Sequence, residues 1–265
     1  MKDIQSEEPR YPVIINKVGI KGIQYPIRVL TKDSRHLDTI ATIATSVSLM
    51  PGQRGTHMSR FIEIIEKYKH NVDGIAIDKM CKEISEKLVT EYSEIDIEFP
   101  YFVSKKAPVS NKQSLYFLIA GFLWTLDADV LTHRLKVRAS VTSLCPCSKE
   151  ISKYGAHNQR AYITLVLQPK EGVFIWFEDM LDIIEMCSSS PIYPLLKRKD
   201  EKFVTERAYE NPMFMEDVVR SVFHKSSEFY YNKVSYIKVS AESEESIHQH
   251  LAFAEIERCL DDTNP

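Results

Sequence analysis

Two apolar stretches on either side of a short acidic turn decide the fold of this chain: Leu115-Tyr-Phe-Leu-Ile-Ala-Gly-Phe-Leu-Trp-Thr-Leu126 and Leu131-Thr-His-Arg-Leu-Lys-Val-Arg-Ala-Ser-Val-Thr-Ser-Leu144. Each is long enough for an extended strand, and the acidic turn Asp127-Ala-Asp129 separates them. We predict a long hairpin here, around which the other elements are arranged.

The same layout of strands and helices occurs twice along the chain, and the hairpin forms the paired long strands of the second copy. Alternating apolar and polar residues predict strands, and apolar residues three or four apart predict amphipathic helices. Before the hairpin we expect strands at Ile14–Leu30, Asp38–Met50 and Ile95–Val103, and helices at Met58–Tyr68 and Ile75–Tyr92.

After the hairpin we expect strands at Arg160–Leu167 and Val234–Ala241, helices at Val173–Cys187 and Met213–Phe229, and a helix or edge strand at His248–Cys259. Paired long strands, paired helices and further strands thus occur twice. This order predicts an α+β protein of two tandem modules, residues 1–110 and 111–265, with helices on one face of antiparallel sheets.

Composition excludes several classes of function. The chain has 265 residues, is 44% hydrophobic and carries a net charge of −3, so it has no overall attraction to nucleic acid or to anionic membranes. No apolar run approaches a membrane span, and the first residues lack the apolar core of a signal peptide. The five cysteines lack the spacing of a disulfide framework and fit a reducing cytoplasm.

The strongest chemical signal is Cys145-Pro-Cys147, followed by His157 in Gly-Ala-His-Asn-Gln-Arg. Thiolate sulfur and imidazole nitrogen are preferred donors for a divalent metal such as zinc. The spacing differs from the Cys-x-x-Cys pairs of structural zinc modules, which favours an open, catalytic type of site. The alternative is a tight turn with two ordinary thiols, and His157 tips the balance towards metal binding.

Four further stretches carry possible chemistry. In Pro191–Lys202, two prolines disfavour a helix, and Lys197 and Arg198 suit a polyphosphate unless the loop is simply solvated. Glu216, in Asn211–Asp217, is suited either to capping a helix or to accepting N–H groups from a purine edge.

The other two stretches contain histidines. His248 and His250 follow an acidic run and suggest proton transfer, or alternatively a solvated surface. Arg54 and His57 stand where a strand gives way to a helix, and they are suited to meeting an anion unless Thr56 is only a helix cap.

Taken in order, the Cys145–Cys147, His157, Lys197–Glu201 and His248–His250 motifs resemble the type IB GTP cyclohydrolase I family over nearly the whole chain. The resemblance implies a tunnelling fold (T-fold) and a homotetramer with sites at subunit interfaces. It also implies conversion of GTP and water to 7,8-dihydroneopterin triphosphate and formate, the first step of tetrahydrofolate synthesis, by a metal-activated water.

The resemblance further implies a role for each site residue. Cys145, His157 and Glu201 hold a divalent ion, such as zinc or manganese, and Cys147 lies beside them. Glu216 anchors the purine. We expect His248, with His250 second, to carry protons, and Lys197, Arg198, Arg54 and His57 to contact the substrate.

Two other functions stay open on the sequence alone. A nitrile reductase of queuosine synthesis has the same fold but uses a cysteine nucleophile and a nicotinamide cofactor. A metal-stabilised purine-binding module would carry out no reaction. The metal-type donors and the Lys197–Arg198 pair favour the hydrolase.

Overall fold

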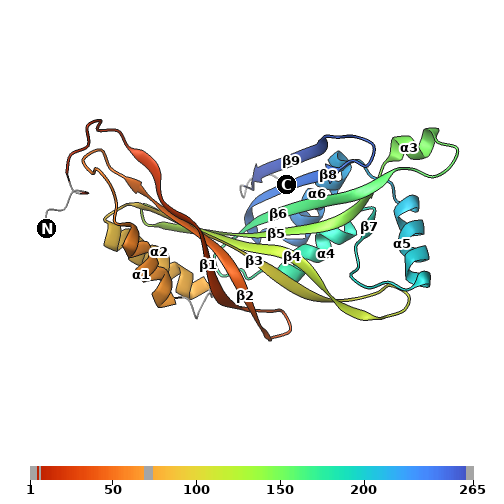
Figure 1. Cartoon of the computed structure of the whole chain (residues 1–265), viewed down its shortest axis with the longest axis horizontal. Coiled ribbons are helices and arrows are strands. Elements are labelled where there is room, and N and C mark those ends of the chain that lie inside the picture. The colour runs from red at the N-terminus through yellow and green to blue at the C-terminus, as the bar shows by residue number, and fades with distance from the viewer. Residues whose placement is uncertain (1–4, 6, 69–73, 261–265) are drawn as a thin grey trace. The chain divides into compact units, whose positions relative to one another are not determined.

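Figure 1 shows the computed structural model, which describes residues 5, 7–68 and 74–260 of the chain. The strands are β1 (Ile15–Leu30), β2 (His36–Leu49), β3 (Tyr92–Lys106), β4 (Gln113–Asp127), β5 (Val130–Leu144), β6 (Asn158–Pro169), β7 (Ser190–Pro191), β8 (Val234–Glu244) and β9 (Leu251–Cys259). The helices are α1 (Met58–Tyr68), α2 (Gly74–Leu88), α3 (Pro146–Ile151), α4 (Phe177–Met186), α5 (Arg198–Glu210) and α6 (Met215–Phe229). Within the described ranges, every helix is too short or too polar to span a bilayer.

Hydrogen bonds order the strands β1-β2-β3-β4-β5-β6-β8-β9, with β7 beside β5. The pairs β1/β2, β2/β3, β5/β6, β6/β8 and β8/β9 are antiparallel. The α+β fold with antiparallel strands is therefore confirmed, as is the hairpin, whose turn places Ala128 in the left-handed region at φ 43°. In the β5/β6 pair, Leu144 lies opposite Asn158. The end of β5 thus meets the start of β6.

The chain forms two compact units, one of residues 1–100 and 121–134 and the other of residues 101–120 and 135–265. We call them unit 1 and unit 2. The strands β3, β4 and β5 contribute residues to both units, because the unit boundaries fall within these strands. The division into modules at residues 110 and 111 stays a prediction.

In unit 1, the predicted amphipathic faces of α1 and α2 form the core with the strands. Phe61 and Ile64 of α1 and Ile84 of α2 are fully buried. The ring of Trp124 stacks on that of His133 at a centroid distance of 5.2 Å, and its Nε1–H donates to Asp78 Oδ1 at 2.7 Å. A buried indole N–H requires such a partner, so this bond fixes the ring against α2.

In unit 2, the helices α4 and α6 lie on one face of the strands, where α6 packs against β8 and β9 (Figure 1). Alternate residues of β6, including Ile163, Leu165 and Leu167, are fully buried. The period of two that predicted this strand therefore also marks the core face.

Several large apolar side chains of unit 2 are exposed because of the same alternation. Leu115 and Phe117 on β4 and Phe253 on β9 are 63%, 52% and 72% exposed. On β4 they alternate with the buried Tyr116 and Leu118, so they belong to the opposite face of the strand. Exposed large apolar side chains on a sheet face are typical of protein–protein contact surfaces.

The prediction of a non-helical segment at Pro191–Lys202 was wrong at its end, because α5 begins at Arg198. The prolines restrict only their own neighbourhood, and Lys197 is extended with φ −104° and ψ 165°, as an N-cap residue is. Cys145 is likewise the N-cap of the short helix α3, with Pro146 at its first position.

Other boundaries also differ from expectation. The helix α2 ends at Leu88 rather than Tyr92, because Val89 turns the chain at φ 52° and β3 begins at Tyr92. The helix α4 begins at Phe177 rather than Val173, because Gly172 turns the chain at φ 74° and Trp176 is extended. The region after the histidines is a strand, β9, and it begins at Leu251.

Candidate active site

The Cys145 and His157 motifs meet where β5 ends and β6 begins. The Cys145 N–H donates to the His157 carbonyl at 3.1 Å, and the His157 N–H donates to Ser148 Oγ at 3.1 Å. Ser148 closes the arrangement, because its N–H donates to Cys145 Sγ at 3.5 Å and its hydroxyl to the Cys145 carbonyl at 3.2 Å. The backbone thus brings Cys145 and His157 next to each other at the ends of the two strands.

The imidazole of His157 is oriented by two oxygen-bearing side chains. Its Nδ1 lies 3.0 Å from Gln159 Oε1 and 3.7 Å from Glu245 Oε2. Gln159 is buried, and the side chains of His157 and Glu245 are only 13% and 14% exposed. A neutral imidazole that donates from Nδ1 has its lone pair on Nε2, which is then available as a metal ligand.

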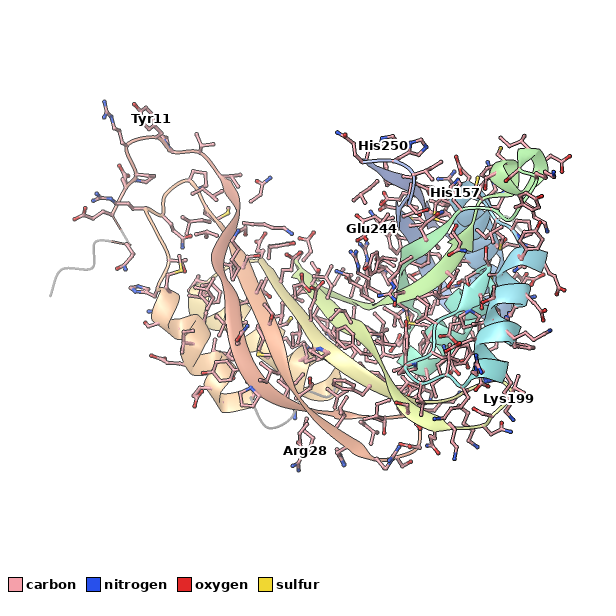
Figure 2. The ribbon with its side chains drawn as sticks, turned by 45° about the vertical axis from the view of Figure 1, so that its right-hand side comes forward. Tyr11, Arg28, His157, Lys199, Glu244 and His250 are labelled. Carbon is pink, nitrogen blue, oxygen red and sulfur yellow. The ribbon has the colours of Figure 1, made fainter. Side chains whose placement is uncertain are left out.

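His248 and His250 lie in the connection between β8 and β9, which continues from Glu245. The His248 N–H donates to the Glu245 carbonyl at 3.1 Å, and the two imidazole rings stack at a centroid distance of 4.9 Å. Both histidines are exposed. Figure 2 shows His250 and His157 at the same end of unit 2.

The start of α6 is attached to this same end. The Met213 N–H donates to the Leu144 carbonyl at 3.1 Å, and the Ser143 hydroxyl donates to the Met213 carbonyl at 3.3 Å. Glu216 is in the first turn of α6, three residues after Met213, which contacts the end of β5. Glu216 is exposed in the single chain, and so is Cys147.

The structure does not bring Glu201 to the Cys145–His157 pair. The Lys149 ammonium reaches the Tyr209 carbonyl at 2.5 Å, so α3 touches the C-terminal turn of α5. Glu201 is in the first turn of α5. At a rise of 1.5 Å per residue, it lies about 12 Å from Tyr209 along the helix axis, towards the N-terminal end of the helix and away from α3. Figure 2 shows Lys199, two residues before Glu201, at the opposite end of unit 2 from His157.

Lys197 and Arg198 share this distant position and are exposed. Across the described ranges, no three His, Cys, Asp or Glu side chains come together in a way that could hold a metal ion. Cys145 and His157 therefore supply only part of the predicted donor set.

Arg54 and His57 belong to unit 1. The Arg54 guanidinium donates to Glu7 Oε2 at 2.8 Å, and the N–H groups of Arg54 and Gly55 both donate to the Gln5 carbonyl. The loop that carries the two predicted anion-binding residues thus contacts the N-terminal segment, and the Arg54 guanidinium is already paired with the Glu7 carboxylate.

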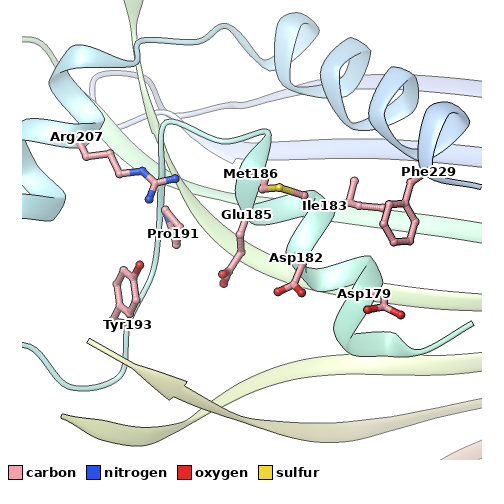
Figure 3. Close-up of a pocket in the computed structure, with 9 residues that line it drawn as sticks. All are labelled: Asp179, Asp182, Ile183, Glu185, Met186, Pro191, Tyr193, Arg207 and Phe229. Atoms are coloured by element: carbon pink, nitrogen blue, oxygen red, sulfur yellow. The ribbon is translucent and has the colours of Figure 1, made fainter. Parts of the chain in front are cut away.

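A pocket of about 510 Å³ lies beside α4 in unit 2, but it contains none of the predicted site residues (Figure 3). Its wall includes Glu185, which pairs with the mostly buried Lys105. Burial raises the pKa of the Glu185 carboxyl and lowers that of the Lys105 amine. We interpret this pair as structural, because it is separate from the thiol and imidazole groups.

Sequence reasoning assigned no role to Glu245 beside His157 or to Asp200 at the distant start of α5, and it did not predict that Gln159 orients the His157 ring. Gln159 is part of the Gly155–Arg160 run, and its place two residues after His157 on a strand puts both on one face. Glu245 was part of the acidic run but indistinguishable from its neighbours. Asp200 lies in the first turn of α5. Acidic residues are favoured near helix N-termini, so Asp200 was a signal in the sequence for the start of this helix.

Residues 1–254 match the protein-family model described as type I GTP cyclohydrolase folE2. The GTP cyclohydrolase FolE2 of Geobacter metallireducens is 47% identical over 261 residues, which cover 97% of each chain. The corresponding protein of Thermosipho melanesiensis is 43% identical over 263 residues, which cover 99% of this chain and 98% of the relative.

Solved structures with a similar fold are uricases. The uricase of Arthrobacter globiformis has a TM-score of 0.53 at 7% identity, covering 94% of this chain and 95% of the uricase chain. The urate oxidase of Bacillus sp. TB-90 has a TM-score of 0.54 at 10% identity, covering 93% and 100%. These proteins are T-fold proteins with tandem modules, so the predicted T-fold is confirmed.

Proposed function

The chain belongs to the type I GTP cyclohydrolase folE2 family, and on that premise we propose which of its residues carry the reaction. It is a GTP cyclohydrolase of folate biosynthesis, and it converts GTP to dihydroneopterin triphosphate. The observation that carries this conclusion is the family match over nearly the whole chain. All five cysteines are free thiols, which supports a cytoplasmic location for the enzyme.

The direct test is to incubate the metal-loaded protein with GTP and to measure formate and, after oxidation, the fluorescent pterin. Stoichiometric release of formate excludes a binding module without activity. Consumption of NADPH with a nitrile substrate, in the absence of formate release, would instead indicate the reductase.

We propose that Cys145 and His157 hold a divalent metal ion, such as zinc or manganese, together with Glu201. The donor chemistry fits, because a thiolate, an imidazole nitrogen and a carboxylate suit several borderline and hard divalent ions. Gln159 supports this assignment by receiving the Nδ1–H of His157, which leaves Nε2 for the ion. When bound, such an ion supplies hydroxide at neutral pH by lowering the pKa of water to about 7.

We propose that Glu201, Lys197 and Arg198 act in the site of a neighbouring copy of the chain. Within one chain these residues lie on the first turn of α5, away from the Cys145–His157 pair, so an intact site needs a second subunit. The exposed Leu115, Phe117 and Phe253 support association of copies. A homotetramer satisfies this requirement.

Mixing two inactive variants tests this arrangement. Cys145→Ala and Glu201→Gln should each lack activity, but their mixed oligomers should regain it, because some sites receive Cys145 from one chain and Glu201 from the other. Random mixing makes roughly one site in four complete. The measurement is formate release after subunit exchange, with mixed oligomers verified by native mass spectrometry. Mixed oligomers without any recovered activity would place Glu201 in the site of its own chain.

The remaining roles concern GTP itself. We propose that His248 donates a proton to the purine nitrogen that is freed when the C8–N bond breaks, with His250 and Cys147 beside it. Lys197 and Arg198 bind the triphosphate, which suits an ammonium and a guanidinium. Arg54 and His57 contact the substrate bound by a neighbouring copy of the chain, and this ligand must displace Glu7 from Arg54.

Glu216 is assigned to anchoring the purine, and Glu216→Gln is expected to weaken GTP recognition while metal stays bound. A carboxylate accepts from two purine N–H groups, whereas an amide offers one acceptor and a mismatched donor. The mispairing should cost roughly 1–3 kcal/mol, or more because the group is charged. The measurements are kcat/KM for GTP and metal content.

The matched control for Glu216 is Asp217→Asn. Asp217 is the next residue and is acidic, and it pairs with the exposed Arg220 at 2.9 Å. If catalytic efficiency is the same in Glu216→Gln as in the wild type, Glu216 only stabilises the start of α6.

A further inference from the structure

Asp200 is the only acidic side chain among the described residues that is wholly shielded from solvent, at 0% exposure. A buried carboxylate needs hydrogen-bond donors that replace the lost water. Asp200 belongs to the first turn of α5, directly before Glu201. Its surroundings therefore determine where Glu201 is held.

Three backbone N–H groups satisfy the Asp200 carboxylate. Oδ1 accepts from Val109 at 2.8 Å and from Ser110 at 2.7 Å, and Oδ2 accepts from Lys197 at 2.8 Å. Burial by itself would raise the pKa of this carboxyl, but hydrogen bonding from the Ser110 side chain, together with the three backbone donors, outweighs burial and holds its pKa well below the usual range.

Two of the three bonds leave the helix. An aspartate that accepts only from Lys197 would be an ordinary helix-capping residue. Val109 and Ser110, however, lie in the turn between β3 and β4, far from α5 in sequence. That turn is closed by its own bonds, from the Ala107 N–H to the Lys112 carbonyl at 2.9 Å and from the Asn111 N–H to the Ala107 carbonyl at 3.1 Å. Asp200 thus connects the start of α5 to a well-defined turn of the sheet.

We propose that Asp200 is a positioning residue that fixes the first turn of α5 to the β3–β4 turn and so determines where Glu201, Lys197 and Arg198 are presented to metal and triphosphate. This inference rests on the proposed roles of those three residues. Asp200 itself contacts neither ligand, and its backbone partners cannot be replaced by mutation, so the test must alter the carboxylate.

Two variants give a graded change. Asp200→Asn keeps an oxygen for Val109 and Ser110 but sets an amide N–H against the Lys197 N–H, whereas Asp200→Ala removes both acceptor oxygens and with them all three hydrogen bonds. We expect the dissociation constant for Mn²⁺, measured by competition with a chelator, to rise roughly 10–100-fold in Asp200→Ala and less in Asp200→Asn. KM for GTP should rise in the same order, while kcat at saturating Mn²⁺ and GTP stays near the wild-type value.

The control is Leu167→Ala, which removes a fully buried side chain of β6 near the end of that strand opposite His157. Its cavity lowers stability without touching α5. The Asp200 proposal fails if both Asp200 variants, measured well below their unfolding temperatures, bind Mn²⁺ and GTP as the wild type does. It also fails if Leu167→Ala reproduces their changes. Wild-type protein that releases no formate would instead overturn the proposed function.

Discussion

Cys145→Ala is expected to lose bound divalent metal and turnover together. Cys145 is the N-cap of α3, and its backbone N–H is bonded to the His157 carbonyl, so the two residues are held together by a main-chain contact that alanine retains. Removing the thiolate takes one donor from a site that has few. Mutating a residue that only hydrogen-bonds to a metal ligand typically costs roughly 10–100-fold in metal affinity. Removing a ligand itself should therefore cost more than that.

The measurements for Cys145 are metal content after dialysis and formate release from GTP. Cys147→Ala serves as the close control, because Cys147 is exposed two residues away, and it should keep most of the metal while losing rate. Cys259→Ala, at the exposed end of β9, should change neither. Normal metal content and full activity in Cys145→Ala would end this assignment. If Cys147→Ala loses metal as completely, both thiols are ligands and Glu201 must be reassigned.

His248→Ala is expected to bind metal and GTP but to stall at or just after the first C8–N bond cleavage. Opening the purine ring requires a proton at the departing nitrogen, and general acid–base help is typically worth roughly 10²–10⁴-fold in rate. The proposed role exists in the transition state, so the dissociation constant for GTP should change little. GTP consumption and formate release are measured separately, because a block after ring opening affects only the second.

His250→Ala is the matched control, because the ring of His250 stacks on that of His248 and both are exposed. If His248 carries the proton, the variant of His250 should lose less activity. Near-normal rates in both variants would mean that the β8–β9 connection is only a solvated loop, and proton transfer would then be assigned to Cys147.

Local patterns predicted most of the fold. The boundaries of α1 matched the predicted Met58–Tyr68, because its apolar residues follow the helical period and its face is buried. The β4–β5 hairpin and the strands β2 and β6 were predicted because buried residues alternate along them with a period of two. The strand β1 was predicted from the same alternation in sequence, although only Ile27 and Val29 of it are buried. Where the spacing of apolar residues within one segment determines its secondary structure, the sequence is sufficient to predict that element.

The site was only partly predictable, because it depends on contacts between distant segments. No local pattern indicates that Asp200 bonds to Val109 and Ser110, or that Gln159 and Glu245 meet His157. The α5 helix was missed because Pro191 and Pro194 suggested a loop. Both prolines precede Lys197, so neither lies within the helix. Glu201 was grouped with Cys145 and His157 through a family resemblance, and a resemblance does not say which subunit contributes a residue.

The Trp124–His133 stack has a spectroscopic consequence. The chain contains two tryptophans, of which Trp124 belongs to unit 1 and Trp176 to unit 2. Trp124 is buried, stacked on His133 and bonded to Asp78, whereas Trp176 is partly exposed and lies edge-on to the ring of Phe174. Replacing either indole with phenylalanine would leave a single emitter in one unit. The denaturation of each unit could then be followed by its own fluorescence, which would reveal whether the two halves melt together or in succession.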